Sequence, residues 1–572
     1  MKNFISFSSF NYGFKKGNWV ELCPILQKLK RLNILLCIFL IFLSFLGLTQ
    51  ETFSQTIEWQ KCLGGSGYDY ANSIQQTTDG GYIVAGSSNS NNKDLSGNQG
   101  SYDFWIVKLS STGTIEWKQC LGGSNVEEAN SIQQTSDGGY VVAGYTLSND
   151  GHVSGNHGLS DFWVVKLTST GAAQWMKCLG GSSADEAYSI QQTTDGGYIV
   201  VGRTYSNDGQ VSGNHGADDC WIVKLSSMGD LEWEVCLGGT GDEIAYSIQQ
   251  TIDGGYILAG TTYSNDGNVG GNHGSCDYWV AKLSPTAEIQ WQKCLGGSAS
   301  DEARSIIQTN DGGYLVAGWA NSNDGDVTNH HGGISDFWVV KLTPTGAIQW
   351  QKCLGGSGID YGRSILQTND NGFIVTGSAL SNDGDVQGNH GSDDFWVVKL
   401  FPSGDIQWQK CLGGSSSDMA FSIKQTSDNK FVVAGHTGSD DYDVKGNRGL
   451  TDYWIVKFSP PASFIENEWY MDNIIQIFPN PATSQITIQL IEPILFSSNI
   501  NVKANELTLY ISDFLGKELQ SFPINLQEHQ FNSLEEIKLD LDISQLSNGV
   551  YTILLKNNQN TIIHYNKLIK MQ

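Results

Sequence analysis

The stretch "ANSIQQTTDGGYIVAG", residues 71–86, decides the fold, because versions of it recur seven times along the chain. It joins two strand-forming runs through an Asp-Gly turn, which is typical of a β-hairpin. After a long polar loop come "DFWIVKL" (103–109), "SSTG" (110–113) and "TIEWKQCLGG" (114–123). Each unit therefore predicts four antiparallel strands, numbered 1 to 4 in chain order, and no helical period appears.

Two series of tryptophans keep a constant spacing of 58 residues, with a single 59 where "TNHHGG" (328–333) carries an extra residue. A period in this range is typical of solenoids, propellers and arrays. We expect the tryptophans to pack between neighbouring units. The first series is Trp59, Trp117, Trp175, Trp233, Trp291, Trp350 and Trp408, and the second is Trp105, Trp163, Trp221, Trp279, Trp338, Trp396 and Trp454.

The phase of the repeat predicts how the array closes. The first unit begins with a strand 4 sequence, "TIEWQKCLGG" (56–65), and the last ends with a strand 3 sequence, "DYWIVKF" (452–458). The N-terminal strand is therefore expected to complete the last unit, which removes the exposed edges at the two ends of the array. We predict an all-β fold with a closed seven-bladed β-propeller over residues 56–459.

Net charge limits the partners of the protein. Thirty-three basic residues against 59 acidic ones give a formal net charge of -26. Such a chain repels phosphate backbones and anionic lipid, so nucleic acid is not an expected partner, whereas cations are.

The N-terminal region, residues 1–55, has the features of an export signal. A basic "KLKR" (28–31) precedes the apolar run "ILLCIFLIFLSFLGL" (34–48). Fifteen apolar residues are short for a membrane span and suit a secretory signal, so we expect cleavage near Gln55. An uncleaved membrane anchor is the alternative.

Eleven cysteines in an exported chain raise the question of disulfides. Seven of them occupy one equivalent position in seven "CLGG" units. Equivalent positions in neighbouring repeats lie farther apart than the Cα separation of about 4.4 to 6.8 Å that a bridge needs. We expect buried free thiols, with Cys220 and Cys276 as the one pair left open.

The C-terminal region carries an ordered set of short motifs after a linker at 460–473. The motifs are Pro479-Asn480-Pro481 before a strand, Gly516-Lys517 in a turn, Gly549-Val550-Tyr551 opening a strand, and the basic Lys567 and Lys570. Together they resemble the type A C-terminal sorting domain of the Bacteroidota type IX secretion system. The resemblance implies a small β-sandwich over 474–572, the type IX machinery as a partner, and delivery to the cell surface or medium, with attachment at the outer membrane as one outcome. An accessory carbohydrate-binding sandwich is the alternative.

The blades themselves resemble two known classes only locally. The "TG" that precedes a tryptophan resembles the docking pattern of quinoprotein propellers, and "GG" is similar to kelch repeats. Both classes have shorter units, so the resemblance favours blades and implies no cofactor.

The loops between strands 2 and 3 share one face of a blade with the connections between strand 4 and the next strand 1. These loops are rich in Asp, Asn and Gly, as in "SNDGDVQGNHGSDDFW" (381–396). Calcium takes six to eight oxygen ligands, so this face offers candidate Ca²⁺ ligands; Asx-turns with glycines at positive φ are the alternative. The candidates are Asp383, Asp385, Asp394, Asp324, Asp326 and Asp336.

A residue that repeats in every blade is architectural, so we look for function where blades differ. Two positions differ most, one in strand 1 and one just after strand 2, and they carry Tyr, Trp, Arg and His, which are typical of binding surfaces. The candidates are Arg304, Arg363, Tyr188, Tyr246, Tyr145, Arg203, Trp319 and His436. We predict a surface module that binds a glycan or protein. A polysaccharide-acting enzyme and a purely structural surface protein are the alternatives, although no nucleophile elbow, phosphate loop or zinc helix motif is present.

Overall fold

The computed structural model describes residues 56–460 and, beyond them, 475–478, 485–490, 507–512, 518–524, 537–547, 549–557 and 562–570. The predicted signal segment 1–55 and almost all of the linker 460–473 lie outside the described residues. Every element in the described ranges is a β-strand. No helix that could cross a membrane occurs in these ranges.

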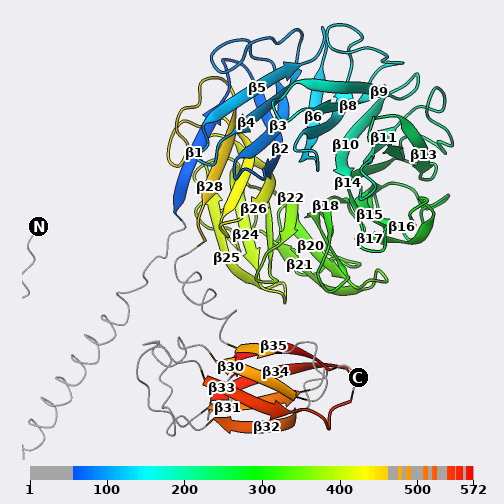
Figure 1. The fold of residues 1–572 in the computed structure, drawn as a ribbon. Helices are drawn as coiled ribbons and strands as arrows, with labels where there is room; N and C mark the ends of the chain where they lie inside the picture. Colours follow the sequence, from blue (N-terminus) through cyan, green and yellow to red (C-terminus); the bar gives the residue numbers. More distant parts are fainter. Residues whose placement is uncertain are drawn as a thin grey trace, which may run out of the picture. The chain divides into compact units, whose positions relative to one another are not determined.

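Strands β1 to β28 form seven four-stranded antiparallel sheets, which are the blades of a propeller (Figure 1). Strand 1 of the blades is β2 (Asp69–Gln76), β6 (Glu127–Gln134), β10 (Asp185–Gln192), β14 (Glu243–Gln250), β18 (Asp301–Gln308), β22 (Asp360–Gln367) and β26 (Asp418–Gln425). Strand 2 is β3 (Tyr82–Ser88), β7 (Tyr140–Thr146), β11 (Tyr198–Thr204), β15 (Tyr256–Thr262), β19 (Tyr314–Ala320), β23 (Phe373–Ala379) and β27 (Phe431–Thr437).

Strands 3 and 4 complete each blade. Strand 3 is β4 (Asp103–Leu109), β8 (Asp161–Leu167), β12 (Asp219–Leu225), β16 (Asp277–Leu283), β20 (Asp336–Leu342), β24 (Asp394–Leu400) and β28 (Asp452–Phe458). Strand 4 is β5 (Ile115–Leu121), β9 (Ala173–Leu179), β13 (Leu231–Leu237), β17 (Ile289–Leu295), β21 (Ile348–Leu354), β25 (Ile406–Leu412) and, for the last blade, β1 (Ile57–Leu63).

The ring closes as the phase of the repeat predicts. β1, at the N-terminal end of the described chain, pairs antiparallel with β28 from Ile57↔Phe458 to Leu63↔Tyr453, and Figure 1 shows the two strands side by side. The indole N–H of Trp454 donates to Gln60 Oε1 at 2.9 Å across this pair. The seven-bladed propeller is therefore confirmed.

Both tryptophan series pack between blades. The seven tryptophans of strand 3 are almost completely buried, and Trp163 lies 4.5 Å from Phe104 of the preceding blade, centroid to centroid. The strand 4 tryptophans lie near a hairpin tyrosine or phenylalanine of the next blade, as for Trp117 and Tyr140 at 5.6 Å and Trp350 and Phe373 at 5.9 Å. Repetition of these contacts around the ring explains the constant spacing of both series.

Two carboxylates meet beside a glycine at every blade junction. A Cβ on Gly64 would lie 2.5 Å from both Asp69 Oδ2 and Asp452 Oδ1, so only glycine fits there. Both aspartates are fully buried, and Asp452 Oδ1 has no hydrogen-bond partner among the described residues. Burial raises the pKa of Asp452 to about 7. The equivalent glycines are Gly122, Gly180, Gly238, Gly296, Gly355 and Gly413.

The nine cysteines of the described residues are free thiols, and all but Cys120 are buried. Cys220 and Cys276, the pair left open by the sequence, are not bridged. Desolvation raises the pKa of Cys62 to about 12, which makes such thiols poor nucleophiles.

The C-terminal region contains two antiparallel sheets. One is ordered β29 (Ile475–Phe478), β30 (Gln485–Leu490), β33 (Ile537–Asp542); the other is ordered β32 (Glu518–Ile524), β31 (Leu507–Ser512), β34 (Gly549–Asn557), β35 (Ile562–Lys570). Leu509, Ile511 and Ile553 are fully buried. The sandwich arrangement of the two sheets stays a prediction.

Candidate functional site

The seven strands of type 1 line the centre of the ring. Each contacts the strand 1 of both neighbouring blades, from β2 and β6 round to β26 and β2. The long loops and the strand 4 connections meet on one face, as expected: the backbone N–H of Ser357 donates to Asp383 Oδ1 at 2.7 Å. We call this the loop-rich face. The mouth of the channel on this face is the candidate site.

The most variable position of strand 1 coincides with a β-bulge in all seven blades. A bulge leaves one residue outside the regular ladder and redirects its side chain. Asn130 Nδ2 thus crosses to the carbonyl oxygen of Ala187 in the next blade, at 2.8 Å. The bulged residues are Asn72, Asn130, Tyr188, Tyr246, Arg304, Arg363 and Phe421. The backbone therefore presents unequal side chains at equal positions around the channel.

Two arginines of this set stack between aromatic rings. Arg304 Cζ lies 3.7 Å from the ring centroid of Tyr246 and 4.5 Å from that of Trp319. Arg363 Cζ lies 5.7 Å from the ring centroid of Trp319 and 4.4 Å from that of Phe421. These are cation–π distances. Trp319, which projects from strand 2 of its blade, is thus shared between two guanidinium groups.

The stacked run continues in both directions. Tyr188 lies 5.0 Å from Tyr246. On the far side, His436 lies 5.2 Å from Phe421 and 4.8 Å from Tyr70, and Tyr70 lies 6.2 Å from Tyr102. We call the residues from Tyr188 to Tyr102 the aromatic–arginine belt: Tyr188, Tyr246, Arg304, Trp319, Arg363, Phe421, His436, Tyr70 and Tyr102.

A polar group in blades 2 and 3 adjoins the belt, because Tyr188 donates its hydroxyl to Glu186 Oε2 at 2.7 Å. Arg203 Nη2 lies 2.9 Å from Glu186 Oε2 and Arg203 Nη1 lies 3.0 Å from Asp218 Oδ2. Tyr145 donates its hydroxyl to Glu128 at 2.8 Å. Burial raises the pKa of Asp218 to about 7 despite the nearby guanidinium. The side chains of Arg203 and Tyr145 are therefore already paired with carboxylates of their own blades.

The structure thus divides the eight predicted binding residues. Six lie in the belt, whereas Tyr145 and Arg203 belong to the polar group. Their role in ligand binding stays a prediction. The eight candidates do not include Tyr70, Tyr102 and Phe421 of the belt or Lys424 in the channel wall, although Lys424 departs from the glutamines that stand at its position in four other blades.

The six aspartates predicted as calcium ligands lie in two equivalent loops. Among the described residues, no three His, Cys, Asp or Glu side chains are grouped as metal ligands. Calcium binding therefore remains a prediction from residue types alone. Asp324 and Asp383 accept the backbone N–H groups of Ser298 and Ser357, Asp336 and Asp394 accept those of His331 and His390, and Asp326 and Asp385 lie 3.4 Å from the N–H groups of Gly296 and Gly355.

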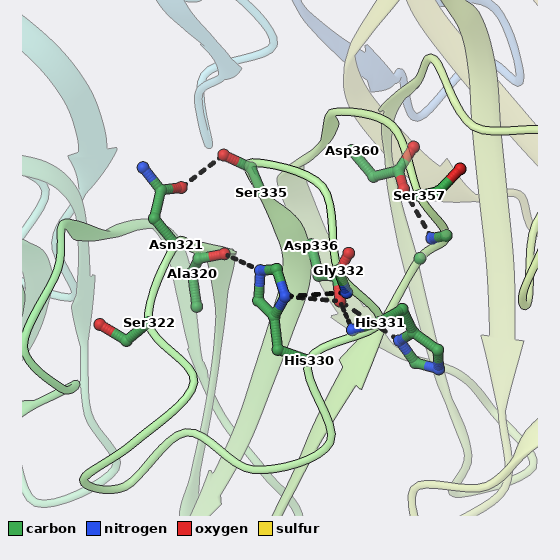
Figure 2. Close-up of polar contacts among 12 residues, drawn as sticks. Ala320, Asn321, Ser322, His330, His331, Gly332, Ser335, Asp336, Ser357 and Asp360 are labelled. Atoms are coloured by element: carbon green, nitrogen blue, oxygen red, sulfur yellow. Dashed lines mark hydrogen bonds and ion pairs between the residues drawn. The ribbon is translucent and has the colours of Figure 1, made fainter.

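In the loop of blade 5, which has the extra residue, a histidine makes the contacts that an asparagine makes in blade 6. His330 Nε2 lies 3.2 Å from the carbonyl oxygen of Ala320, and the N–H of Gly332 donates to His330 Nδ1 at 3.1 Å; Figure 2 draws both contacts. In blade 6 the side-chain amide of Asn389 makes the equivalent two bonds. Because a backbone N–H can only donate, the proton of this imidazole sits on Nε2. His330 is therefore a turn element, whereas His331 contacts Asp336 at 3.2 Å and, in the next blade, Asp385 at 3.4 Å.

The sorting motif is described only in part. Gly549, Val550 and Tyr551 open β34 as predicted, and Tyr551 donates its hydroxyl to the carbonyl oxygen of Ser547 at 2.7 Å. Lys567 and Lys570 lie in β35. The remaining motif residues, Pro479, Asn480, Pro481, Gly516 and Lys517, lie outside the described residues.

Comparison with solved structures finds matches of low identity. BBS1N, from a complex with ARL6DN, is 10% identical with a TM-score of 0.39, over 71% of this chain and 97% of that one. A putative gluconolactonase is 10% identical with a TM-score of 0.33, over 72% and 96%. A puromycin hydrolase is 11% identical with a TM-score of 0.34, over 65% and 50%.

A search of curated proteins gives no match. Residues 476–571 match the secretion system C-terminal sorting domain family. This match covers β29 to β35 and confirms the family that the C-terminal motifs resemble. The sorting domain implies interaction with the secretion machinery and export to the cell surface or beyond. The protein is therefore an exported seven-bladed β-propeller followed by a secretion system C-terminal sorting domain.

Proposed function

We propose that the protein is a surface or secreted binding module whose ligand is a glycan held at the mouth of the channel. The aromatic–arginine belt carries this proposal. Aromatic side chains offer broad, rigid contact surfaces at low entropic cost, and arginines add directed hydrogen bonds. The bulged position of strand 1 is equivalent in all seven blades but carries different side chains. The channel mouth is therefore a single asymmetric site and does not repeat one weak binding site seven times.

A binding role suits the carboxylates of the channel better than glycoside hydrolysis does. Hydrolysis needs a pair of accessible acids flanking the scissile bond. Asp218 has a raised pKa but is only 1% exposed, and Glu302 is engaged by Arg304 at 2.8 Å. Polysaccharide turnover by the intact chain would favour the enzyme alternative.

A glycan array tests the proposal. The wild-type propeller should bind a defined subset of glycans, and Tyr246→Ala and Trp319→Ala should each weaken that binding at least about tenfold, because large aromatic anchors dominate recognition. Tyr442→Ala is the matched control, since Tyr442 is 65% exposed on the rim of the loop-rich face. Trp319 is buried, so the melting temperature of each variant should be recorded.

The absence of any bound glycan would contradict the proposal. Equal loss in Tyr442→Ala would also contradict it, because the belt would then not be the site.

Export gives a second test. A chain that lacks residues 474–572 should remain inside the cell envelope, whereas the full chain should appear at the surface or in the medium. Immunoblots of cell fractions measure the distribution, and the full-length Tyr442→Ala chain is the control. Normal delivery of the truncated chain would show that the sorting domain is dispensable.

A further inference from the structure

Charge is unevenly distributed around the channel. The second residue of strand 1 is an acid in blades 2, 3 and 5, and each of these acids has a partner: Glu128 with Tyr145, Glu186 with Arg203, and Glu302 with Arg304. In blades 6 and 7 this position holds Tyr361 and Met419. Those two blades nevertheless contribute Arg363 and Lys424 to the channel. Together with Arg304 of blade 5, they form what we call the basic wall: Arg304, Arg363 and Lys424.

Arg363 has no partner for its charge. Within residues 56–460, no ion pair or hydrogen bond engages its guanidinium, and its Nε–H is buried without an acceptor. The rings of Trp319 and Phe421 hold the group in place. Burial and the nearby Arg304 lower the pKa of Arg363 to about 10, so it remains charged. An unsatisfied buried donor costs free energy, and a ligand that supplies an acceptor recovers it.

Arg304 is only partly satisfied. Its Nη2 donates to Glu302 Oε2 at 2.8 Å, but its Nε–H is also buried without an acceptor in the described region. Tyr246 and Trp319 stack on the guanidinium. Stacking occupies the faces of a guanidinium and leaves its edge, which carries the N–H groups, for a ligand.

Lys424 extends the basic wall deeper into the channel. The equivalent Gln75 accepts the backbone N–H of Gln134 in the next blade, at 2.6 Å, which places this position on the channel side of strand 1. In the described part of the chain Lys424 has no hydrogen bond or ion pair. Desolvation by neighbouring protein atoms lowers the pKa of the Lys424 ammonium. The Lys424 side chain nevertheless remains exposed to solvent. His436, whose pKa falls to about 3 through burial, adds no charge.

We propose that the basic wall, formed by Arg304, Arg363 and Lys424, binds an oxyanion substituent, a carboxylate or sulfate, carried by the glycan. This inference rests on the proposed function. Arginine edges bind such oxyanions through two parallel hydrogen bonds. The rings of Tyr246 and Trp319 lie 3.7 to 5.7 Å from the Cζ atoms of the two arginines. In this proposal these rings contact the sugar that carries the oxyanion. A nucleic acid phosphate does not fit a chain of net charge -26.

Calorimetric titration tests the inference with three probes: an oligogalacturonate, its neutral methyl ester, and inorganic sulfate. The oligogalacturonate should bind wild type at least about tenfold more tightly than the ester does, since a charge-assisted bidentate pair contributes more than about 1.4 kcal/mol. Arg363→Gln and Lys424→Gln should each reduce that preference, and Arg363→Lys, which keeps the charge but loses the fork, should restore part of it. Lys293→Gln is the control, because it removes one charge from the exposed outer strand β17.

The outcomes separate the two proposals. Equal affinity for acid and ester, or equal loss in Lys293→Gln, would overturn the oxyanion site and leave glycan binding intact. Sulfate binding that depends on Arg363, without any oligosaccharide binding, would support the oxyanion site and overturn the glycan function. The absence of binding to all three probes would overturn the oxyanion site. Arg363→Gln can perturb packing, so Lys424→Gln, at a solvent-reached position, provides the independent variant.

Discussion

Deletion of residues 57–63, which form β1, should lower the free energy of unfolding by more than about 5 kcal/mol and make the protein aggregate. β1 buries Leu63 and Cys62 in two different core clusters, and full burial of such side chains is worth about 1.5 to 3 kcal/mol each. Its loss also exposes the edge of β28, an apolar strand that is buried throughout. Exposed apolar edges pair with other chains. Guanidinium chloride titration and size-exclusion chromatography measure both effects.

A permuted chain provides the control for this deletion. Residues 56–65 are moved to follow Phe458 through the turn "TPTG" (343–346), which joins strands 3 and 4 in blade 5. The last blade then has the same connection as the others, and the stability of the full chain should return. If the deletion variant has the same free energy of unfolding as wild type, closure by β1 is not what stabilises the ring.

Stability should increase as the pH falls from 8 to 5.5, by an amount on the order of a few kcal/mol. Burial raises the pKa values of Asp452 and Asp218 to about 7, and those of Asp103 and Asp394 to about 6. In the unfolded chain these carboxyls titrate near 3.8, so in this range the folded state binds more protons. His436 acts in the opposite direction below pH 6.5, because its pKa is lowered to about 3. Chemical denaturation at several pH values measures the balance.

Asp452→Asn should remove part of this pH dependence and stabilise the protein at pH 8 by about 1 to 3 kcal/mol. The amide keeps an acceptor for the backbone N–H of Arg448, which now bonds Asp452 Oδ2 at 3.0 Å, and avoids a buried charge.

Asp428→Asn is the matched control for Asp452→Asn. Lys457 lies 2.8 Å from Asp428 and lowers the pKa of that carboxyl to about 2. This variant should lose stability at pH 8. A stability that rises steadily from pH 5.5 to 8 in wild type would contradict the assignment of raised pKa values.

The architecture was predictable because it repeats. The Asp-Gly hairpin of 71–86 fixes strands 1 and 2, and the strand 4 sequence at 56–65 fixes closure, so the ring follows from local patterns and their order. Because Trp59 belongs to the first tryptophan series, the sequence already places the strand that carries it as the fourth strand of the last blade. Its edge contact with Tyr82, at 5.5 Å, shows the same inter-blade packing as elsewhere.

The site was predictable only as a set of unequal positions. The sequence cannot show that two arginines contact the ring of Trp319, because that contact depends on how far each bulge turns a side chain toward its neighbour. It also cannot show that Arg203 is neutralised by Glu186 and Asp218, since these residues come from different strands. Lys424 cannot be singled out from the sequence, because apolar Ile307 and Leu366 stand at the same position in blades 5 and 6 and variation there is also typical of packing.

Ring closure by the first strand makes assembly a competition between copies. Gln60 and its partner Trp454 are 394 residues apart, but the entropic cost of joining such distant segments exceeds that for adjacent blades by only about 2 kcal/mol. Every copy of the chain carries the same β1 sequence, IEWQKCL, so the vacant edge of an open ring accepts the first strand of any copy equally well. We therefore expect dilute chains to close on themselves. At high protein concentration we expect chains to exchange first strands and form domain-swapped oligomers.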